Sequence, residues 1–337
     1  MNVQQIIFPE VNKAALIERT IGEPGAGQVL VKTAVSTVSP GTERANITGD
    51  ANVAGANAPS VKFPRASGYS SAGTVVKTGA GVTHVKEGDR VVVFWGTHSS
   101  YNLVPASQAV KIEQDGISFD EAAFSFIATF PLAAVRKCRV ELGESAMVMG
   151  LGLLGQLAVR LLRAAGATPI IAADPVESRR AEALAGGADY ALDPLAPDFA
   201  QTVKSLTGGG VNAAIEVTGV GAGLDETLDC MAKFGRVALL GCTRDKNFTI
   251  DYYRKVHCPG IQLIGAHTNA RPMQESHPGY FTHQDDIRAV LKLCASGRMK
   301  LADMVREQHT PDECQAVYDR LINDRNFPIV TQFKWGE

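Results

Sequence analysis

One short turn combines three kinds of side chain that take part in acid–base and hydrogen-bond chemistry. Residues 39–44 read SPGTER and follow QVLVKTAVSTV (28–38), a Val- and Thr-rich run typical of a strand. The Pro-Gly pair ends that strand and turns the chain, and a hydroxyl, a carboxylate and a guanidinium follow directly. Ser39 and Thr42 are therefore candidates for substrate contact. Glu43 is expected to be structural, as a partner of a backbone N–H or of a buried arginine.

A glycine triplet farther along the chain predicts a nucleotide-binding turn. Residues 147–155 read MVMGLGLLG, an apolar strand followed by G-x-G-x-x-G at Gly150, Gly152 and Gly155, and a helical pattern comes next. The first glycine permits the tight turn, the second allows backbone to approach a pyrophosphate, and the third lets helix and strand pack closely. Leu153 and Leu154 open the helix, whose free N–H groups face the phosphates.

An acidic residue after this turn favours NAD as the cofactor. The next strand, PIIAAD, ends in Asp174, nineteen residues after Gly155. A carboxylate there accepts hydrogen bonds from the ribose hydroxyls and repels a 2′-phosphate. Arg179 follows closely, facing either the adenine or a phosphate.

The elements that must position these residues divide the chain into two kinds of structure. The first ~110 residues are short Val/Ile/Thr runs separated by Gly and Pro turns, which predicts a β-barrel. After a helical segment at 122–138, six candidate strands alternate with helices, which predicts a parallel sheet covered on both faces. The tail contains two helical patterns, within 285–323, and a last strand, PIVTQFKW. The fold class is therefore α/β.

Composition excludes several classes of protein. The formal net charge of the 337 residues is -2, so no charge excess favours nucleic acid or an anionic membrane. The six cysteines are far apart, without a CxxC pair, which argues against a disulfide scaffold or a zinc ribbon. The start, MNVQQIIFPEVNK, lacks the apolar core of a signal peptide, and no apolar run is long enough to cross a bilayer. We therefore expect a cytoplasmic protein.

The order of elements and several motifs resemble the medium-chain dehydrogenase/reductase family. GTE at 41–43 is similar to the family's Gly-Thr-Asp turn, residues 67–93 resemble its Gly-His-Glu…Gly-Asp-Arg-Val stretch, and VMGLGLLGQLAVRLLRAAGA resembles its nucleotide turn. The resemblance implies a GroES-like catalytic domain at 1–124 and 265–337 and a Rossmann NAD-binding domain at 125–264, with the active site between them. It also implies a homodimer or homotetramer.

The departures from the family pattern predict a branch without zinc. Where the zinc enzymes have a Cys, a His and a Glu as ligands, this chain has Pro40, Tyr69 and Ser70, and the four-Cys structural lobe is missing. Proline cannot bind a metal, and neutral Tyr and Ser are poor zinc ligands. SPGTE and GYS resemble sequences of a branch often linked to sugar or (bacterio)chlorophyllide dehydrogenation. We predict no metal site.

Without zinc, side chains must move the alcohol proton and stabilise charge on the oxygen. The resemblance implies that Thr42 relays the proton toward the cofactor ribose; the alternative is a helix cap. Tyr69, at the position of a zinc-binding His, is a candidate acid–base group or a space-filling aromatic. His98 is the general-base candidate by residue type, or a structural histidine. Trp95 is either a substrate wall or part of the core.

A polar loop at 261–286 contains three histidines, at 267, 277 and 283. The loop is a candidate lid, substrate contact, subunit contact or rebuilt metal site; His267, nearest the strand end, is the candidate substrate contact. Further cofactor contacts are predicted where two successive strands end, at Thr218, Gly241, Cys242 and Thr243.

These residues lead to one main function and two alternatives. The main prediction is a zinc-independent, NAD-dependent dehydrogenase that oxidises a secondary alcohol of a polyhydroxylated small molecule, such as a sugar, glycoside or polyol, or catalyses the reverse reaction. The alternatives are a quinone or enoyl reductase of the same family and a non-catalytic nucleotide-binding protein.

Overall fold

The computed structural model describes residues 1–50, 61–243 and 247–336, and it divides the chain into two compact units. Unit 1 comprises Met1–Ile127 and Ile287–Glu337, and unit 2 comprises Ala128–Asp286. Residues 265–286, which we expected to belong to the GroES-like domain, thus lie in the same unit as the parallel sheet. Each unit is described below by itself.

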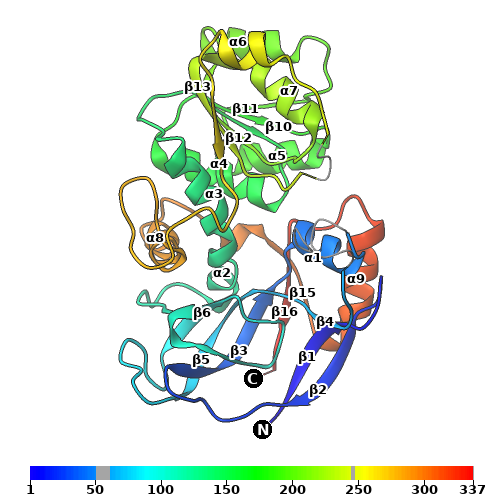
Figure 1. Cartoon of the computed structure of the whole chain (residues 1–337), viewed down its shortest axis with the longest axis vertical. Helices are drawn as coiled ribbons and strands as arrows, with labels where there is room; N and C mark the ends of the chain where they lie inside the picture. The colour runs from blue at the N-terminus through cyan, green and yellow to red at the C-terminus, as the bar shows by residue number, and fades with distance from the viewer. Residues whose placement is uncertain (51–60, 244–246, 337) are drawn as a thin grey trace. The chain divides into compact units, whose positions relative to one another are not determined.

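Unit 1 is mainly antiparallel β-structure made from both ends of the chain (Figure 1). Its larger sheet has the order β15-β16-β3-β5-β6-β8, with β7 also paired to β3, and a smaller sheet has the order β2-β1-β4. β16, coloured red in Figure 1, pairs with β3 in blue. Its elements are β1 (Asn2–Phe8), β2 (Ala15–Thr20), β3 (Gln28–Thr37), α1 (Pro40–Ile47), β4 (Arg65–Ala66), β5 (Ser70–Thr78), β6 (Arg90–Phe94), β7 (Tyr101–Pro105), β8 (Ala109–Lys111), α2 (Phe119–Ala122), β15 (Val305–His309), α9 (Cys314–Asn323) and β16 (Val330–Lys334).

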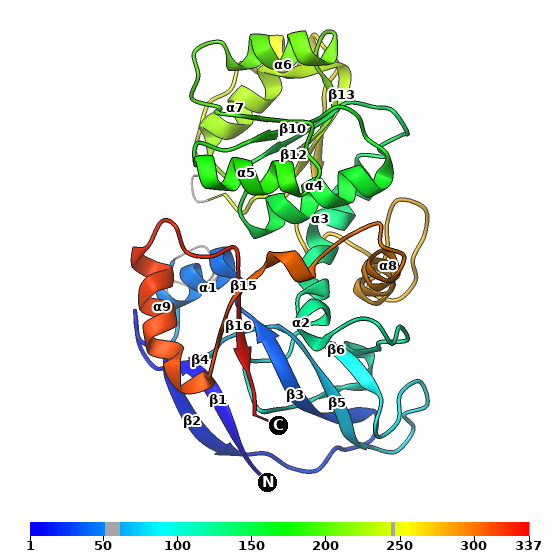
Figure 2. The ribbon, with the colours of Figure 1, turned by 180° about the vertical axis from the view of Figure 1, so that it is seen from behind.

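Two clusters of apolar side chains hold unit 1 together. Alternate valines of β3, β5 and β6, among them Val31, Val75 and Val91, form one cluster inside the larger sheet. The second lies where α1 and α9 cover the smaller sheet, and it includes Ile47 and Tyr318. Figure 2 shows α1 and α9 side by side although they come from opposite ends of the chain. The predicted barrel of β-strands is thus present.

Unit 2 is a six-stranded parallel sheet with the order β11-β10-β9-β12-β13-β14. Numbered from the first of its strands, this is the order 3-2-1-4-5-6 of a Rossmann fold, which reverses direction between β9 and β12. All six strands predicted from the sequence are present. The elements are β9 (Ala146–Met149), α4 (Leu153–Ala165), β10 (Ile170–Ala173), α5 (Glu177–Ala185), β11 (Tyr190–Leu192), α6 (Phe199–Thr207), β12 (Val211–Glu216), α7 (Gly221–Asp229), β13 (Met231–Leu239) and β14 (Gln262–Gly265).

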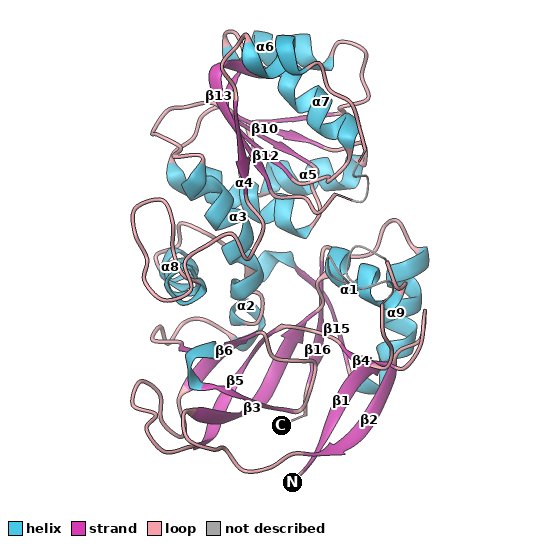
Figure 3. Cartoon of the chain, viewed as in Figure 1, coloured by secondary structure: helices cyan, strands magenta, loops and turns pink. Residues whose placement is uncertain are grey.

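Helices cover both faces of this sheet, as Figure 3 shows in cyan and magenta. Side chains of α6 and α7, such as Phe199 and Leu228, pack on one face against Met147 and Ile171. The helix α4 buries its own apolar side, including Leu157 and Leu161, and follows β9 directly. Two further helices, α3 (Ser125–Lys137) and α8 (His283–Ala295), cross the boundary between the units.

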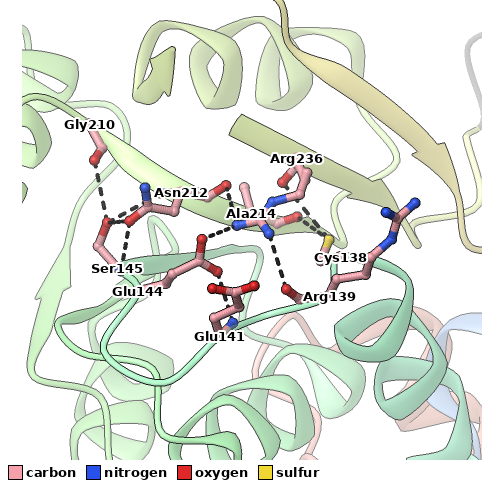
Figure 4. A network of polar contacts seen from close by, with 9 residues as sticks. All are labelled: Cys138, Arg139, Glu141, Glu144, Ser145, Gly210, Asn212, Ala214 and Arg236. Carbon is pink, nitrogen blue, oxygen red and sulfur yellow. Dashed lines mark hydrogen bonds and ion pairs between the residues drawn. The ribbon is translucent and has the colours of Figure 1, made fainter. Parts of the chain in front are cut away.

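Polar contacts fasten the edge of the sheet at which the strands begin (Figure 4). Arg236 of β13 donates to a carboxylate oxygen of Glu144 at 2.6 Å and to the backbone oxygen of Arg139 at 3.1 Å. Ser145 Oγ donates to Asn212 Oδ1 at 2.9 Å, and Arg236 also donates to the backbone oxygen of Asn212, so these contacts join β9, β12 and β13. The Cys138 thiol is buried in this network, and burial raises its pKa to about 12. This edge is structural, and the opposite edge is the one available to a ligand.

All six cysteines are free thiols, as their spacing predicts. Among the described residues, no helix combines the length and the apolar character needed to cross a lipid bilayer.

Candidate active site

A pair of hydroxyl groups marks the candidate catalytic position in unit 1. Tyr69 Oη donates to Ser39 Oγ at 2.5 Å, which joins two segments thirty residues apart in the sequence. Both side chains are largely buried. Ser39 is the residue before α1, and its Oγ accepts from Tyr69, so a hydroxyl that also carries its own hydrogen can act as a donor to a further group.

The indole of Trp95 lies beside this pair and is partly open to solvent. Its ring centroid is 5.5 Å from that of Tyr69 and 5.0 Å from that of Phe126, and 39% of the residue is exposed. Trp95 also adopts φ 56°, a left-handed backbone conformation that is strained for a bulky side chain. Such outliers are concentrated at functional sites, where the surrounding structure holds them in place. The exposed face and the strained backbone are consistent with a substrate wall.

Thr42 does not cap the helix, contrary to one alternative drawn from the sequence. The helix α1 begins at Pro40, so Thr42 lies within its first turn and is exposed. Glu43 performs the capping role instead, because its side chain accepts from the backbone N–H of Ser39 at 2.8 Å. The predicted partner of Glu43 is therefore confirmed, whereas the relay role of Thr42 stays a prediction.

His98 is buried in a hydrogen-bond network, and this position does not support the predicted general base. The residue is 0% exposed. Its Nδ1 lies 2.7 Å from Ser36 Oγ and its Nε2 lies 3.1 Å from Glu43 Oε2, so both ring nitrogens are occupied within unit 1. A base needs access to the substrate proton, which neither nitrogen has.

The chemistry of the side chains where the family holds zinc does not fit a metal. The Ser70 hydroxyl is buried and donates to the backbone oxygen of Ala123 at 2.6 Å, and Tyr69 donates to Ser39. Pro40 offers no donor atom. Within the described part of the chain, no three His, Cys, Asp or Glu side chains are grouped so that they could hold an ion.

In unit 2, the glycine turn has the geometry predicted from the sequence. Gly150 adopts φ 95°, and a Cβ on it would lie 3.0 Å from Thr218 Cγ2. A Cβ on Gly155 would overlap the backbone oxygen of Gly150, whereas a Cβ on Gly152 would meet no atom within 4 Å. Gly152 is the residue before α4, so the first backbone N–H groups of that helix, at Leu153 and Leu154, face the turn. The open space beside Gly152 fits a pyrophosphate.

Asp174 follows β10 and is tied to the same turn. Its Oδ2 accepts from the backbone N–H of Leu151 and its Oδ1 from that of Val176, both at 2.8 Å. Arg179 Nη1 lies 3.7 Å from Asp174 Oδ2. The carboxyl group is thus held next to the glycine turn, and its role in binding a ribose stays a prediction.

A buried carboxyl that sequence inspection missed shapes the end of β12. Glu216 accepts from the backbone N–H of Thr218 at 2.7 Å and also from the Thr218 hydroxyl, and burial raises the pKa of Glu216. These bonds hold Thr218 next to Gly150 at the point where the strand order reverses. A Cβ on Gly241 would press against the backbone of Gly219, so this turn is closely packed, and Cys242 and Thr243 after it are exposed.

The histidine loop of unit 2 is pinned by a buried ion pair. Arg271 lies 3.0 Å from Asp286, and Arg136 of α3 lies 2.9 Å from the same carboxylate. His267 is exposed and accepts from the backbone N–H of Asn269 at 3.2 Å, so its substrate role stays a prediction. His283 is buried, with Nδ1 3.2 Å from the Thr129 hydroxyl.

Acid should weaken unit 2 through His283. Burial, assisted by the positive charge of Arg271, lowers the pKa of His283 to about 3. In the unfolded chain, His283 binds a proton near pH 6.5, whereas in the folded chain it stays neutral until about pH 3. The contribution of neutral His283 to the free energy of unfolding is therefore complete above pH 6.5 and is lost as the pH decreases toward 3. In urea unfolding, the loss of stability between pH 7 and pH 5 should be smaller in His283→Gln than in the unmodified protein. An equal loss in both would contradict this assignment.

Two segments of the chain match models of known protein families. Residues 25–114 match the model of the alcohol dehydrogenase GroES-like domain, and residues 154–293 match that of the zinc-binding dehydrogenases. D-guloside 3-dehydrogenase of Escherichia coli (strain K12) is 28% identical over 62% of this chain, and the match spans only 59% of that relative. L-threonine 3-dehydrogenase of Pyrococcus horikoshii is 27% identical over 95% of each chain.

Solved structures share the whole fold. A putative zinc-binding dehydrogenase of Sinorhizobium meliloti 1021, bound to NADP, superposes with a TM-score of 0.82 at 21% identity, and 99% of each chain is covered. At this identity the likeness shows a common fold.

Proposed function

Because the chain belongs to the medium-chain dehydrogenase/reductase family, we propose that it is a nicotinamide-dependent dehydrogenase that needs no catalytic zinc. Its substrate is a secondary alcohol of a sugar, glycoside or polyol, which it oxidises to a ketone or forms from one. The observation that carries this proposal is the Tyr69–Ser39 hydroxyl pair beside the exposed face of Trp95. By the resemblance, Tyr69 stands at the position of a zinc-binding His, and Ser39 directly precedes Pro40, which stands at the position of the zinc-binding Cys.

The two hydroxyls can move the proton that accompanies hydride transfer. In the reducing direction, Ser39 Oγ donates its hydrogen to the substrate oxygen and recovers one from Tyr69 Oη. Tyr69 is left as a phenolate and takes a proton back from water, and oxidation reverses this order. The indole of Trp95 offers an apolar face against which a sugar ring can stack. A nicotinamide dinucleotide, held by the glycine turn, Asp174 and Thr218, would exchange the hydride when bound.

Two arguments support a sugar or polyol as the substrate: the predicted substrate contacts and the similarity to one curated relative. The predicted substrate contacts in unit 1 are the hydroxyls of Ser39 and Tyr69 and the indole of Trp95 rather than aliphatic side chains, which suits a polyhydroxylated ligand. D-guloside 3-dehydrogenase, one of the matched relatives, is named for the oxidation of a sugar derivative. The predicted dimer or tetramer and the cytoplasmic location remain predictions.

A substrate screen tests the proposed function. Sugars, glycosides and polyols are incubated with the protein and NAD, and NADH formation is followed by its absorbance, with quinones and enones assayed in the reverse direction with NADH and NADPH. We expect turnover of a polyhydroxylated substrate by protein that contains well under one zinc ion per chain and keeps its activity after chelation. A requirement for stoichiometric zinc would refute the metal-free mechanism, and turnover of quinones or enones alone would favour the reductase.

NADH should bind more tightly than NADPH. The Asp174 carboxylate beside the glycine turn repels a 2′-phosphate, and we expect a preference of about tenfold or more, equivalent to about 1.4 kcal/mol. Arg179 lies close enough to offset part of this repulsion, so Arg179→Ala should widen the preference. Fluorescence titration of both cofactors measures the two affinities. Equal affinities, or a preference for NADPH, would show that Asp174 does not select the cofactor. The fold itself can hold NADP, because the Sinorhizobium meliloti dehydrogenase was solved with that cofactor bound.

A further inference from the structure

A buried network of five side chains in unit 1 lies behind the hydroxyl pair. Glu43 Oε2 accepts from the Tyr318 hydroxyl and lies 3.1 Å from His98 Nε2. His98 Nδ1 lies 2.7 Å from Ser36 Oγ, and the indole N–H of Trp335 donates to that oxygen at 2.8 Å. Glu43, His98, Ser36, Tyr318 and Trp335 are all less than 9% exposed. Tyr318 and Trp335 belong to the last part of the chain, whereas the other three precede residue 100.

The indole of Trp335 and the carboxylate of Glu43 fix two bond directions in the network. An indole N–H can only donate, so Ser36 Oγ accepts from Trp335. A carboxylate can only accept, so His98 carries a hydrogen on Nε2 and donates it to Glu43. Each nitrogen of His98 has a partner, because its Nδ1 lies 2.7 Å from Ser36 Oγ.

Glu43 is the acceptor at which three donors converge. The Tyr318 hydroxyl, the His98 Nε2–H and the backbone N–H of Ser39 all point to its two oxygens. A buried carboxylate needs such donors, because burial without them costs several kcal/mol. Burial and the nearby Glu43 charge raise the pKa of Tyr318 well above its usual range, so its hydroxyl remains a donor.

The network reaches the hydroxyl pair through the backbone of Ser39. Glu43 Oε1 holds the N–H of Ser39 at 2.8 Å, and the Oγ of the same residue receives the Tyr69 hydroxyl at 2.5 Å. We infer that Glu43, oriented by His98, is a positioning residue that fixes Ser39 so that its hydroxyl and that of Tyr69 form one proton-carrying pair. This inference rests on the proposed function. It assigns His98 a role behind the site rather than in it.

A double-mutant cycle tests the inference, because a residue that acts only through Tyr69 loses its effect when the Tyr69 hydroxyl is absent. We expect Glu43→Gln to lower kcat about tenfold in the unmodified protein and less than about twofold in the Tyr69→Phe background. KM for NAD should stay unchanged in both backgrounds, since the dinucleotide is held by unit 2. Thr33→Val, which removes a separate buried hydrogen bond from Asn102 in the same unit, serves as the matched control and should leave kcat unchanged.

A merely structural role would give a different result. Glu43→Gln would then lower kcat by the same factor in both backgrounds, or lower it in parallel with Thr33→Val, and either outcome overturns the inference. If Glu43→Gln does not fold, Ser36→Ala probes the far end of the network and should lower kcat about threefold with the same dependence on Tyr69. If Tyr69→Phe alone leaves kcat unchanged, the proposed function fails, and the inference fails with it because there is no proton-carrying pair to position.

A spectroscopic measurement tests the network without turnover. Nitrogen-15 NMR of the histidine side chains should show one imidazole, absent in His98→Asn, that carries a hydrogen on Nε2 at pH 7. A ring without a hydrogen on Nε2 would contradict the bond that His98 donates to Glu43.

Discussion

Replacing Tyr69 with Phe should lower kcat by about 10²- to 10⁴-fold, the range typical for loss of a general acid or base. The substitution removes only the hydroxyl that donates to Ser39 Oγ, so Ser39 loses the group that replaces its proton. The ring is retained, and with it the packing against Trp95 and Phe126. Affinity for NADH should change by less than about twofold, because the predicted dinucleotide site lies in residues of unit 2.

The comparison variant for Tyr69→Phe is Tyr190→Phe. Tyr190 lies on β11 in unit 2 and is 41% exposed, so the same chemical change there should leave kcat unaltered. Steady-state rates with the substrate identified in the screen give kcat, and fluorescence titration gives the affinity for NADH. If Tyr69→Phe turns over at the unmodified rate, the hydroxyl pair does not carry the proton.

Gly152 and Gly155 of the same turn should respond to substitution by alanine in opposite ways, because a Cβ meets different surroundings at the two positions. Gly155→Ala places a methyl group against the backbone oxygen of Gly150, and such overpacking costs about 1–3 kcal/mol. Gly152→Ala places its methyl group in open space, so the protein should fold with unchanged stability. That open space is where the pyrophosphate is expected, and NADH binding should weaken at least tenfold in Gly152→Ala.

Thermal unfolding and NADH titration separate these two effects. Gly155→Ala should lower Tm, by about 2–4 °C per kcal/mol for a unit of this size. Gly152→Ala should keep Tm in the absence of NADH and lose the stabilisation that added NADH gives the unmodified protein. Normal NADH binding by Gly152→Ala would place the pyrophosphate elsewhere.

The sequence was most informative where function depends on backbone geometry. The glycine turn, the strand before it and the order of the parallel strands could all be predicted, because each has a local pattern in the chain. Glu43 could also be assigned a structural partner, since it follows a Pro-Gly turn in the first turn of α1.

The side-chain network could not be predicted in the same way. His98 has the residue type of a base, but its burial depends on Ser36 and on residues near the other end of the chain. Tyr318 reaches Glu43 across 275 positions of sequence, and no local pattern reports such a contact. Glu216 looked like the end of an ordinary strand, although its carboxyl organises the turn that holds Thr218. In each case the information lies in tertiary contacts.

The pairing of β16 with β3 sets an order of events during synthesis. Residues 128–286 leave the ribosome as a continuous stretch, so unit 2 can complete its sheet while the chain is still growing. Unit 1 must wait for residues 330–335, which supply its closing strand and the indole bound to Ser36. A nascent chain should therefore acquire the ability to hold a dinucleotide before it can use one, and catalysis should begin only after residues 330–335 have been synthesised.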